Sequence, residues 1–460
     1  MKTKITLLLV FLFAGVIMVS AQDNEEDMNT LSIFDQYAKA KNYEAAYGPW
    51  KELRDRNPKF SRAIYTHGEK ILKHKIKNSS GAEKVAFVND LMSMYDQRIE
   101  NFASKTKVGD ILSKKAQLMY DYKSDLGTSD TDIYQAFDNA YQKDASTFTN
   151  PKALYTYFKT MVNLYDAGQK PAESLFTKYD EISEKVEAEV KNYTQKLNKY
   201  VSIGDEEVQL SKKDKSRQKS YSSYLKAYDQ ISSGMDKDLG DRANCENLIP
   251  LYSKNYEANK SDALWLQRAM NRLYTKGCTD DPLFVKVVQQ KNNLQPNAST
   301  AYYLGILKEK EGDDAAALEF YNQAVELETD SYEKAKTLYR IAKNFKDKGR
   351  YGKARTYYYR ALENNPSMGS CYLSVAAMYA SSANNCGDSN FNKRAVFWLA
   401  AQEAAKAGRV DGNLRTASSK TVANYNAKAP TKSEIFTAGN AGQSIKIGCW
   451  IGRSVTVPNL

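Results

Sequence analysis

The chain has 460 residues and a formal net charge of +11 at pH 7, and 26% of its residues are charged. A chain of this length exceeds what one compact core usually holds, so we expect several domains or an array of repeats. Both signs of charge are mixed along the sequence, which has no zinc finger, RNP-like segment or long basic tail, so nucleic-acid binding is not expected. The two histidines, His67 and His74, lie too far apart to be paired metal ligands at helical i, i+4 spacing.

Residues 1–21 have the pattern of a secretory signal peptide. A basic start precedes an apolar run over residues 5–19, and small residues ending at Ala21 complete a cleavage site. An uncleaved membrane anchor is the alternative, but the run is shorter than the roughly 20 residues that a spanning helix needs. Because the first cysteine is Cys245, we expect no lipid anchor at the cleavage site. We therefore predict an exported protein that is periplasmic or associated with the outer membrane, and peripheral to the membrane at most.

Residues 22–175 are predicted to form helical repeats, because apolar residues recur there at helical spacing. His67 takes a position that a leucine would usually hold, so we interpret it as a core residue. The first apolar positions are Ile33, Phe34 and Tyr37, followed by Tyr43, Ala46, Trp50 and Leu53, with Pro58 closing the segment. Further helices are expected over residues 85–102, 109–123, 130–142 and 151–166.

Residues 176–240 are predicted to form a long helical hairpin with a basic connector. The first helix carries an apolar stripe over residues 179–200, and a second helix is expected to run to about residue 235. The connector, residues 203–219, is polar and basic. We expect this hairpin to project from the rest of the molecule, either as a solvated connector or as an arm that docks on an acidic surface. The candidate docking residues are Lys212, Lys213, Lys215, Arg217 and Lys219.

Residues 241–430 contain the clearest repeat, which runs from Ala335 to Ser367. Its first helix is marked by Leu338, Ile341, Ala342 and Phe345, and its second by Ala354, Tyr358 and Ala361, with Gly349 between them and Pro366 at the end. The same pattern returns 34 residues later at Tyr372, Val375, Ala376 and Tyr379. It also appears 37 residues earlier at Ala301, Leu304, Gly305, Gly312, Ala317, Tyr321 and Ala324.

This spacing resembles the tetratricopeptide repeat (TPR), whose period is 34 residues. The resemblance implies an all-α fold, a TPR-like α-solenoid in which helix–turn–helix repeats stack into a superhelix. The third C-terminal unit departs from the pattern, because Ala400, Ala404 and Ala407 arrive about 12 residues late. The extra segment, SSANNCGDSNFNKRAVFW, must loop out or lengthen the second helix.

In the TPR family the first helix of each repeat lines a concave surface. Carried onto this sequence, the register implies a candidate binding surface for an extended peptide or an acidic segment, and the alternative is that its members are ordinary exposed residues. The predicted members are Tyr302, Ile306, Lys336, Tyr339, Lys343 and Leu373.

All five cysteines lie in the second half of the chain, and export favours disulfides. Cys245 and Cys278 flank one helical unit, so we pair them. Cys371 falls at a packing position within a repeat helix and is expected to be the free, buried thiol, which leaves Cys386 to pair with Cys449. The tail, residues 431–460, is predicted to form a β-hairpin that caps the last repeat, because residues 444–447 and 454–457 alternate in polarity.

The resemblance implies a non-catalytic scaffold that binds other proteins, of the exported envelope type found in Gram-negative bacteria. For a protein of this type it implies a role in outer-membrane assembly or secretion. The alternative is a helical-repeat protein that captures a glycan or peptide for uptake, for which grouped exposed tryptophans would be the sign. An enzyme is not expected, because G-x-S-x-G, H-E-x-x-H and P-loop motifs are missing from the sequence. We expect no metal and no cofactor.

Overall fold

The computed structural model describes residues 24–201 and 209–460, which form two compact units. Unit 1 ends at Val186 and unit 2 begins at Glu187, within one long helix. The predicted signal peptide lies outside the described residues, and so do residues 202–208 of the predicted connector. Within the described ranges, no helix combines the length and the apolar character needed to cross a bilayer.

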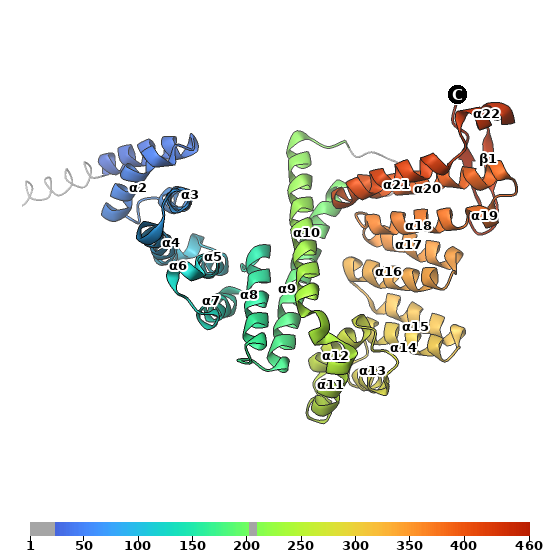
Figure 1. Ribbon diagram of the computed structural model, residues 1–460, viewed down its shortest axis with the longest axis horizontal. Helices are drawn as coiled ribbons and strands as arrows, with labels where there is room; N and C mark the ends of the chain where they lie inside the picture. The colour runs from blue at the N-terminus through green and yellow to red at the C-terminus, as the bar shows by residue number, and fades with distance from the viewer. Residues whose placement is uncertain (1–23, 202–208) are drawn as a thin grey trace, which may run out of the picture. The chain divides into compact units, whose positions relative to one another are not determined.

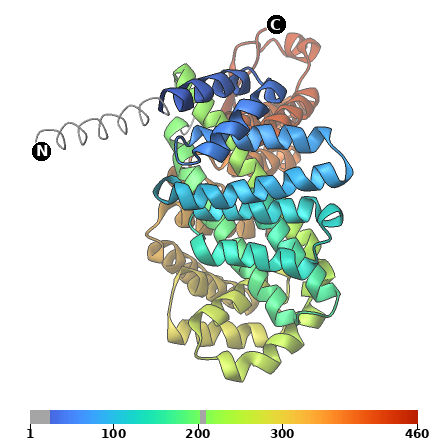
Figure 2. The same cartoon turned by 90° about the vertical axis from the view of Figure 1, so that its left-hand side faces the viewer.

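Unit 1 is a succession of helices in which most helices pack against others close to them in the chain (Figures 1 and 2). It comprises a helical segment over residues 24–39, α2 (Tyr43–Arg56), α3 (Ala63–Asn78), α4 (Gly81–Asn101), α5 (Val108–Asp121), α6 (Lys123–Leu126), α7 (Asp130–Asp144), α8 (Pro151–Asp166) and the first part of α9 (Ala172–Leu197).

Trp50 of α2 is at the centre of the first core. The ring is fully buried, and its indole N–H donates a hydrogen bond of 2.7 Å to the carbonyl of Ile64. Gly68 allows α3 to come this close, since an added Cβ would lie 2.7 Å from the Trp50 ring. His67 lies beside this core, with Nε2 3.0 Å from a carboxylate oxygen of Asp35. It is half-buried at the edge of the core and is not the fully buried core residue that the sequence indicated.

Unit 2 contains the remaining helices and the only two strands of the described residues. They are the end of α9, α10 (Lys212–Leu239), α11 (Cys245–Asn259), α12 (Ala263–Thr275), α13 (Pro282–Leu294), α14 (Ala298–Lys310), α15 (Asp314–Leu327), α16 (Ser331–Asp347), α17 (Tyr351–Asn364), α18 (Gly369–Ser381), α19 (Ala383–Cys386), α20 (Asn390–Val410), α21 (Arg415–Lys428), α22 (Lys432–Ala438), β1 (Ser444–Ile447) and β2 (Arg453–Thr456).

The helix pairs α14–α15 and α16–α17 are the two repeats that the sequence period predicts. Gly312 and Gly349 follow the first helix of each pair with φ values of +83° and +72°, a left-handed conformation that glycine adopts without steric cost. Gly305 lets the two helices of its pair approach, because a Cβ there would lie 2.6 Å from the Tyr321 ring. The small residues therefore occupy the crossing points of the helices, and the buried tyrosines fill the gaps beside them.

The third repeat accommodates its extra segment in two ways. Part of the segment forms the short helix α19, and the rest lengthens α20, which begins at Asn390 and packs against α18. Cys386 ends α19 and is bonded to Cys449, with Cα atoms 5.2 Å apart. The insertion thus carries the anchor point for the C-terminal tail.

The C-terminal tail forms a two-stranded antiparallel hairpin, with Ser444 opposite Thr456. Its inward side chains are buried, and Trp450 in the connecting turn packs on the rings of Tyr351 and Tyr379. Arg355 of α17 donates a hydrogen bond of 2.6 Å to the carbonyl of Ile451. The hairpin therefore packs against the last repeats. With the helix pairs described above, this confirms the predicted fold class, an all-α TPR-like α-solenoid with a small C-terminal β-hairpin.

The predicted cysteine pairs are both at bonding distance. Cys245 and Cys278 have Cα atoms 5.5 Å apart, within the range that a disulfide spans. Cys371 is a free thiol with no exposed surface, and burial raises its pKa. A thiol in this position is held as the neutral, unreactive form.

Candidate functional site

The predicted concave surface does not lie open in the structure. Tyr302 and Ile306 of α14 are 1% and 9% exposed, respectively. The Tyr302 hydroxyl lies 2.8 Å from that of Tyr274 on α12, and its ring packs against Tyr321. These two residues belong to the repeat core, so their assignment to a binding surface was wrong. The preceding helix pair contributes Tyr274, which covers Tyr302.

The end of α9 covers a third member of that surface, Lys336. Lys336 of α16 is paired with Glu187 of α9, and Lys191 of α9 is 3.0 Å from Asp330 at the start of α16. Further along, the Asn198 side chain accepts a hydrogen bond of 3.3 Å from the backbone of Ser367, just before α18. The helical hairpin therefore lies against the repeats of unit 2, and the expectation that it projects from them was wrong.

The remaining predicted members of the surface have local roles. Tyr339 packs edge-on against Tyr358, with ring centroids 5.4 Å apart. Lys343 is exposed and pairs with Asp347 of its own helix at 2.9 Å. Leu373 is half-buried on α18. The six residues therefore do not form one continuous open face.

A set of tyrosines joins α9 to α10. Tyr193 stacks on Tyr224 with ring centroids 4.6 Å apart and an interplanar angle of 13°. Tyr228 is fully buried behind this pair, and Tyr221 lies between Tyr193 and Tyr200. Offset aromatic pairs of this kind add to the energy of area burial. They fix the position of α10 and so determine which of its side chains face the rest of unit 2.

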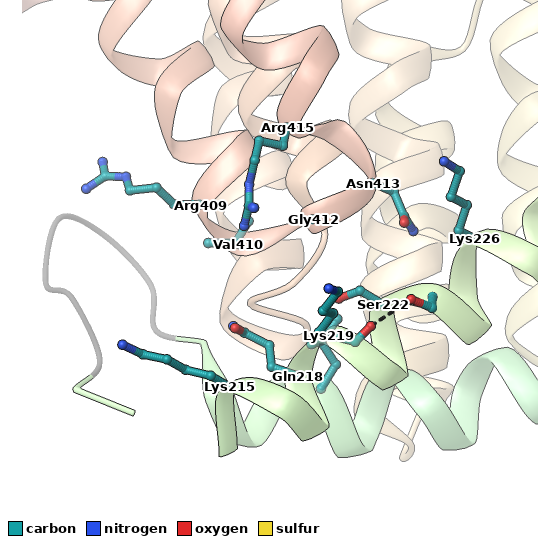
Figure 3. Close-up of a pocket in the computed structure, with 12 residues that line it drawn as sticks. Lys215, Gln218, Lys219, Ser222, Lys226, Arg409, Val410, Gly412, Asn413 and Arg415 are labelled. Carbon is teal, nitrogen blue, oxygen red and sulfur yellow. Dashed lines mark hydrogen bonds between the residues drawn. The ribbon is translucent and has the colours of Figure 1, made fainter. Parts of the chain in front are cut away.

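The side chains of α10 face a cavity of about 450 Å³ between this helix and the corner where α20 meets α21 (Figure 3). Among the residues that the structure describes, the cavity wall includes five cations and no carboxylate. Leu197 at the end of α9 and Val410 at the end of α20 are buried and form its apolar part. The cations are Lys215, Lys219, Lys226, Arg409 and Arg415.

Helical spacing explains the lysine row. Lys215 and Lys219 are four residues apart, and Lys226 follows seven residues later with Ser222 between them, so all four side chains lie on one face of α10. Opposite them, Arg409 is in the last turn of α20 and Arg415 begins α21. Two separate segments of the chain thus bring like charges to one cavity.

The turn between α20 and α21 closes one side of this cavity. Gly412 lies against α10, where an added Cβ would be 3.4 Å from the Ser222 hydroxyl. Asp411 holds the turn by accepting a hydrogen bond of 2.9 Å from the backbone of Asn413. Burial raises the pKa of Asp411. Its carboxylate is occupied with the turn and is not part of the cavity wall.

The cations of the cavity are exposed and mostly without acidic partners. Within residues 24–201 and 209–460, the three lysines and Arg415 form no ion pair. Uncompensated like charges raise the free energy of the empty site, and a bound anion lowers it. The geometry is therefore that of an anion-binding site, which we call the basic pocket.

Two of the predicted docking residues, Lys215 and Lys219, line the basic pocket. Arg217 pairs with Asp214 at 3.1 Å, while Lys212 and Lys213 are exposed at the start of α10 outside the pocket wall. Lys226 was not predicted, although its spacing from Lys219 placed it on the same helical face. Arg409 and Arg415 were not predicted either, because only the packing of the turn between α20 and α21 against α10 brings them there.

A second polar cluster, in unit 1, surrounds Lys178 of α9. The ammonium lies 2.5 Å from Glu181 and 3.2 Å from Asp138, and it donates a hydrogen bond of 2.5 Å to the hydroxyl of Tyr157. Tyr157 in turn donates to Asp138. Burial alone would lower the pKa of Lys178, but the hydrogen bond to Glu181 and the nearby carboxylates outweigh it and raise the pKa. The ammonium is therefore held in its charged form as a structural cation, not as a base or nucleophile.

Neither a metal site nor a stacking platform is evident in the described part of the chain. No group of three or more potential metal ligands occurs there. The four tryptophans lie on separate elements and none is exposed. Trp50 and Trp398 are buried, whereas Trp265 and Trp450 are half-buried against neighbouring rings. Grouped, exposed tryptophans, the sign that would favour glycan capture, are therefore not found among the described residues.

Sequence similarity to the curated proteins described here covers about a fifth of the chain. No protein-family model matches the sequence. The chain is 34% identical over 111 residues to the Photosystem I assembly protein Ycf3 of Cuscuta gronovii, covering 22% of this chain and 66% of that protein. Ycf3 of Cyanophora paradoxa is 34% identical over 107 residues, covering 21% and 62%. The chain thus spans just under two thirds of the length of these curated relatives.

Among solved structures, a tetratricopeptide repeat protein from Parabacteroides merdae is 10% identical with a TM-score of 0.26, covering 68% of this chain and 97% of that one. Yeast Tom70 is 13% identical with a TM-score of 0.25, covering 90% and 83%. With TM-scores this low, the similarity to these structures does not indicate a function.

Proposed function

We propose that this protein is a non-catalytic scaffold that binds other proteins and assists the assembly of a complex. The observation that carries the proposal is the stack of TPR-like helix pairs in unit 2, which presents an exposed basic pocket beside the repeats. Helical repeats of this kind build extended binding surfaces from nearest-neighbour packing. The relatives of highest identity given above are named as assembly proteins, which agrees with a role of this general kind.

The proposed place of action is the cell envelope. The signal-peptide pattern of residues 1–21 supports export, and the pairing of four cysteines supports an oxidising compartment. The scaffold would then act in the periplasm or at the outer membrane, in outer-membrane assembly or secretion. Fractionation of cells that express a C-terminally tagged chain tests this location, and recovery in the cytoplasm with residues 1–21 retained would contradict it.

The binding function is tested by affinity purification of the tagged chain from mildly solubilised envelopes after brief cross-linking. We expect at least one protein partner at a stoichiometric level, with cross-links to unit 2. A chain that purifies as a monomer without any cross-linked protein would contradict the scaffold function. A bead-only preparation from the same envelopes is the control for proteins that adhere without specificity.

A further inference from the structure

We propose that the basic pocket binds an extended acidic segment of a partner protein, with the carboxylates of the segment lying along α10. This inference rests on the proposed scaffold function and adds the chemistry of the partner. Figure 3 shows the arrangement: Lys215 and Arg409 lie toward one end of the pocket, Lys226 and Asn413 toward the other, and Lys219 between them.

The length of the lysine row favours an extended chain over a compact anion. Lys215 and Lys226 are eleven residues apart on α10, which corresponds to about 16 Å along the helix axis at about 1.5 Å per residue. An extended peptide rises by about 3.3 Å per residue, so about five residues span this row. A single phosphate or sulfate would contact only one end of the lysine row and leave the lysine at the other end without a bound anion.

The composition of the pocket wall favours carboxylates over a nucleic-acid strand. Over residues 24–201 and 209–460, the wall holds cations, serine and amide groups, and a small apolar part, but no aromatic residue. Proteins that bind single strands combine a cationic groove with aromatic rings on which bases stack. The basic pocket has the first of these features alone. Guanidinium groups such as those of Arg409 and Arg415 suit carboxylates, with which they form paired hydrogen bonds.

Polar groups of the wall add donors for the backbone of such a segment. The amide of Asn413 and the hydroxyl of Ser222 lie between the cations on the two sides. Ser223 already donates to the carbonyl of Lys219 at 2.9 Å, so its hydroxyl is engaged within α10. The expected contacts are therefore ion pairs with the lysines and arginines, supplemented by hydrogen bonds from Asn413 and Ser222.

Fluorescence anisotropy with the full chain tests the assignment, using a fluorescein-labelled peptide of about six glutamates as the probe, a length that matches the lysine row. We expect saturable binding at low salt that weakens at physiological salt, because the contacts are exposed ion pairs. Lys219→Glu, within the pocket wall, should weaken binding by about tenfold or more. Lys213→Glu makes the same charge change on the same helix outside the wall and should weaken it by less than about twofold.

The outcomes separate the alternatives. Equal losses in the two variants, or no binding of the glutamate peptide at low salt, would overturn the assignment. Displacement of the peptide by an equal concentration of inorganic pyrophosphate would show a site for compact anions and overturn it as well, as would tighter binding of single-stranded DNA. Circular dichroism and melting temperature of both variants establish that each is folded as the parent is.

The two experiments distinguish an error in the assignment of the basic pocket from an error in the proposed scaffold function. If envelope purification yields a partner that Lys219→Glu retains, and the peptide does not bind, the pocket assignment fails alone. If no partner is recovered but the peptide binds and Lys219→Glu loses it, the scaffold function fails and the pocket assignment stands.

Discussion

Glu187 of α9 forms an ion pair with Lys336 of α16, at a place where the sequence predicted an open binding surface. Glu333 also lies 3.3 Å from the Lys336 ammonium. Burial and the nearby positive charge of Arg340 lower the pKa of Lys336 to about 8. The chain thus uses its own hairpin to satisfy a cation that would otherwise face solvent or a partner.

Reversing the charge of Glu187 should release the end of α9 from the repeats. In Glu187→Lys a cation faces Lys336 and Arg340, and the repulsion of partly exposed like charges costs about 1–2 kcal/mol of docking free energy. Hydrogen–deuterium exchange over residues 187–200 should become about five- to thirtyfold faster. The double variant Glu187→Lys/Lys336→Glu should restore protection, and a swap that leaves exchange fast would count against the pair as the docking contact.

Removing Lys178 should destabilise unit 1 strongly. Lys178→Ala leaves the carboxylates of Asp138 and Glu181 without their buried counter-ion, and loss of one partner of a buried pair costs about 3–5 kcal/mol. Urea unfolding of the full chain should show the midpoint of unit 1 shifted to lower concentration. Lys77→Ala, an exposed lysine of α3, should change stability by less than about 0.5 kcal/mol. Similar small effects in both variants would show that the cluster contributes little.

The charged carboxylate of Asp144 should stabilise unit 1, and this stabilisation should be lost at acidic pH. Burial alone would raise the pKa of this carboxyl, but hydrogen bonds from Ser146, Thr147 and the backbone of Gly109 outweigh it and lower the pKa from 3.8 to about 2. A lowered folded-state pKa means that the stabilisation is complete above the unfolded value and is lost as the pH falls toward 2. Because the group is partly exposed, we expect about 1 kcal/mol.

The measurement is urea unfolding of the parent and of Asp144→Asn at several pH values. The variant should be less stable by about 1 kcal/mol at pH 7, and the difference should shrink as the pH falls from about 5 to 3. Asp55→Asn, at an exposed position of α2, is the control. A difference between parent and Asp144→Asn that does not depend on pH would show that the carboxylate charge is not the cause.

The bond between Cys386 and Cys449 should stabilise the C-terminal hairpin. It joins residues 63 positions apart, and loss of a native disulfide typically costs about 2–5 kcal/mol. Cys386→Ser/Cys449→Ser should therefore increase hydrogen exchange over residues 444–457, because a two-stranded hairpin is marginal without additional support. Exchange in unit 1 provides the internal control and should not change.

Peptide mapping without reduction tests the pairing itself. Cys371 should be recovered as a free thiol that alkylates only after unfolding, since it is fully buried and its pKa is raised. A bridged Cys371 would contradict the pairing.

Sequence alone determined the repeats, because their signal is local. Gly305, Gly312 and Gly349 stand at close crossings or left-handed positions that other residues fill poorly, so their spacing predicts helix pairs directly. Cys371 occupies a packing position within a repeat helix, so its burial could also be predicted from the local pattern. The cysteine pairing followed from placing the remaining cysteines around these helices.

The tertiary structure decided which faces of those helices remain open. Helical periodicity shows which residues share a face, but it does not show which distant segment packs there. Tyr274 buries Tyr302, and Glu187 reaches Lys336, through contacts between residues far apart in the chain. For the same reason Arg409 and Arg415 join the lysines of α10 only after the turn between α20 and α21 has packed against that helix. Both the burial of Tyr302 and the clustering of the five cations depend on contacts between residues far apart in the chain. Only the folded chain therefore reveals the basic pocket.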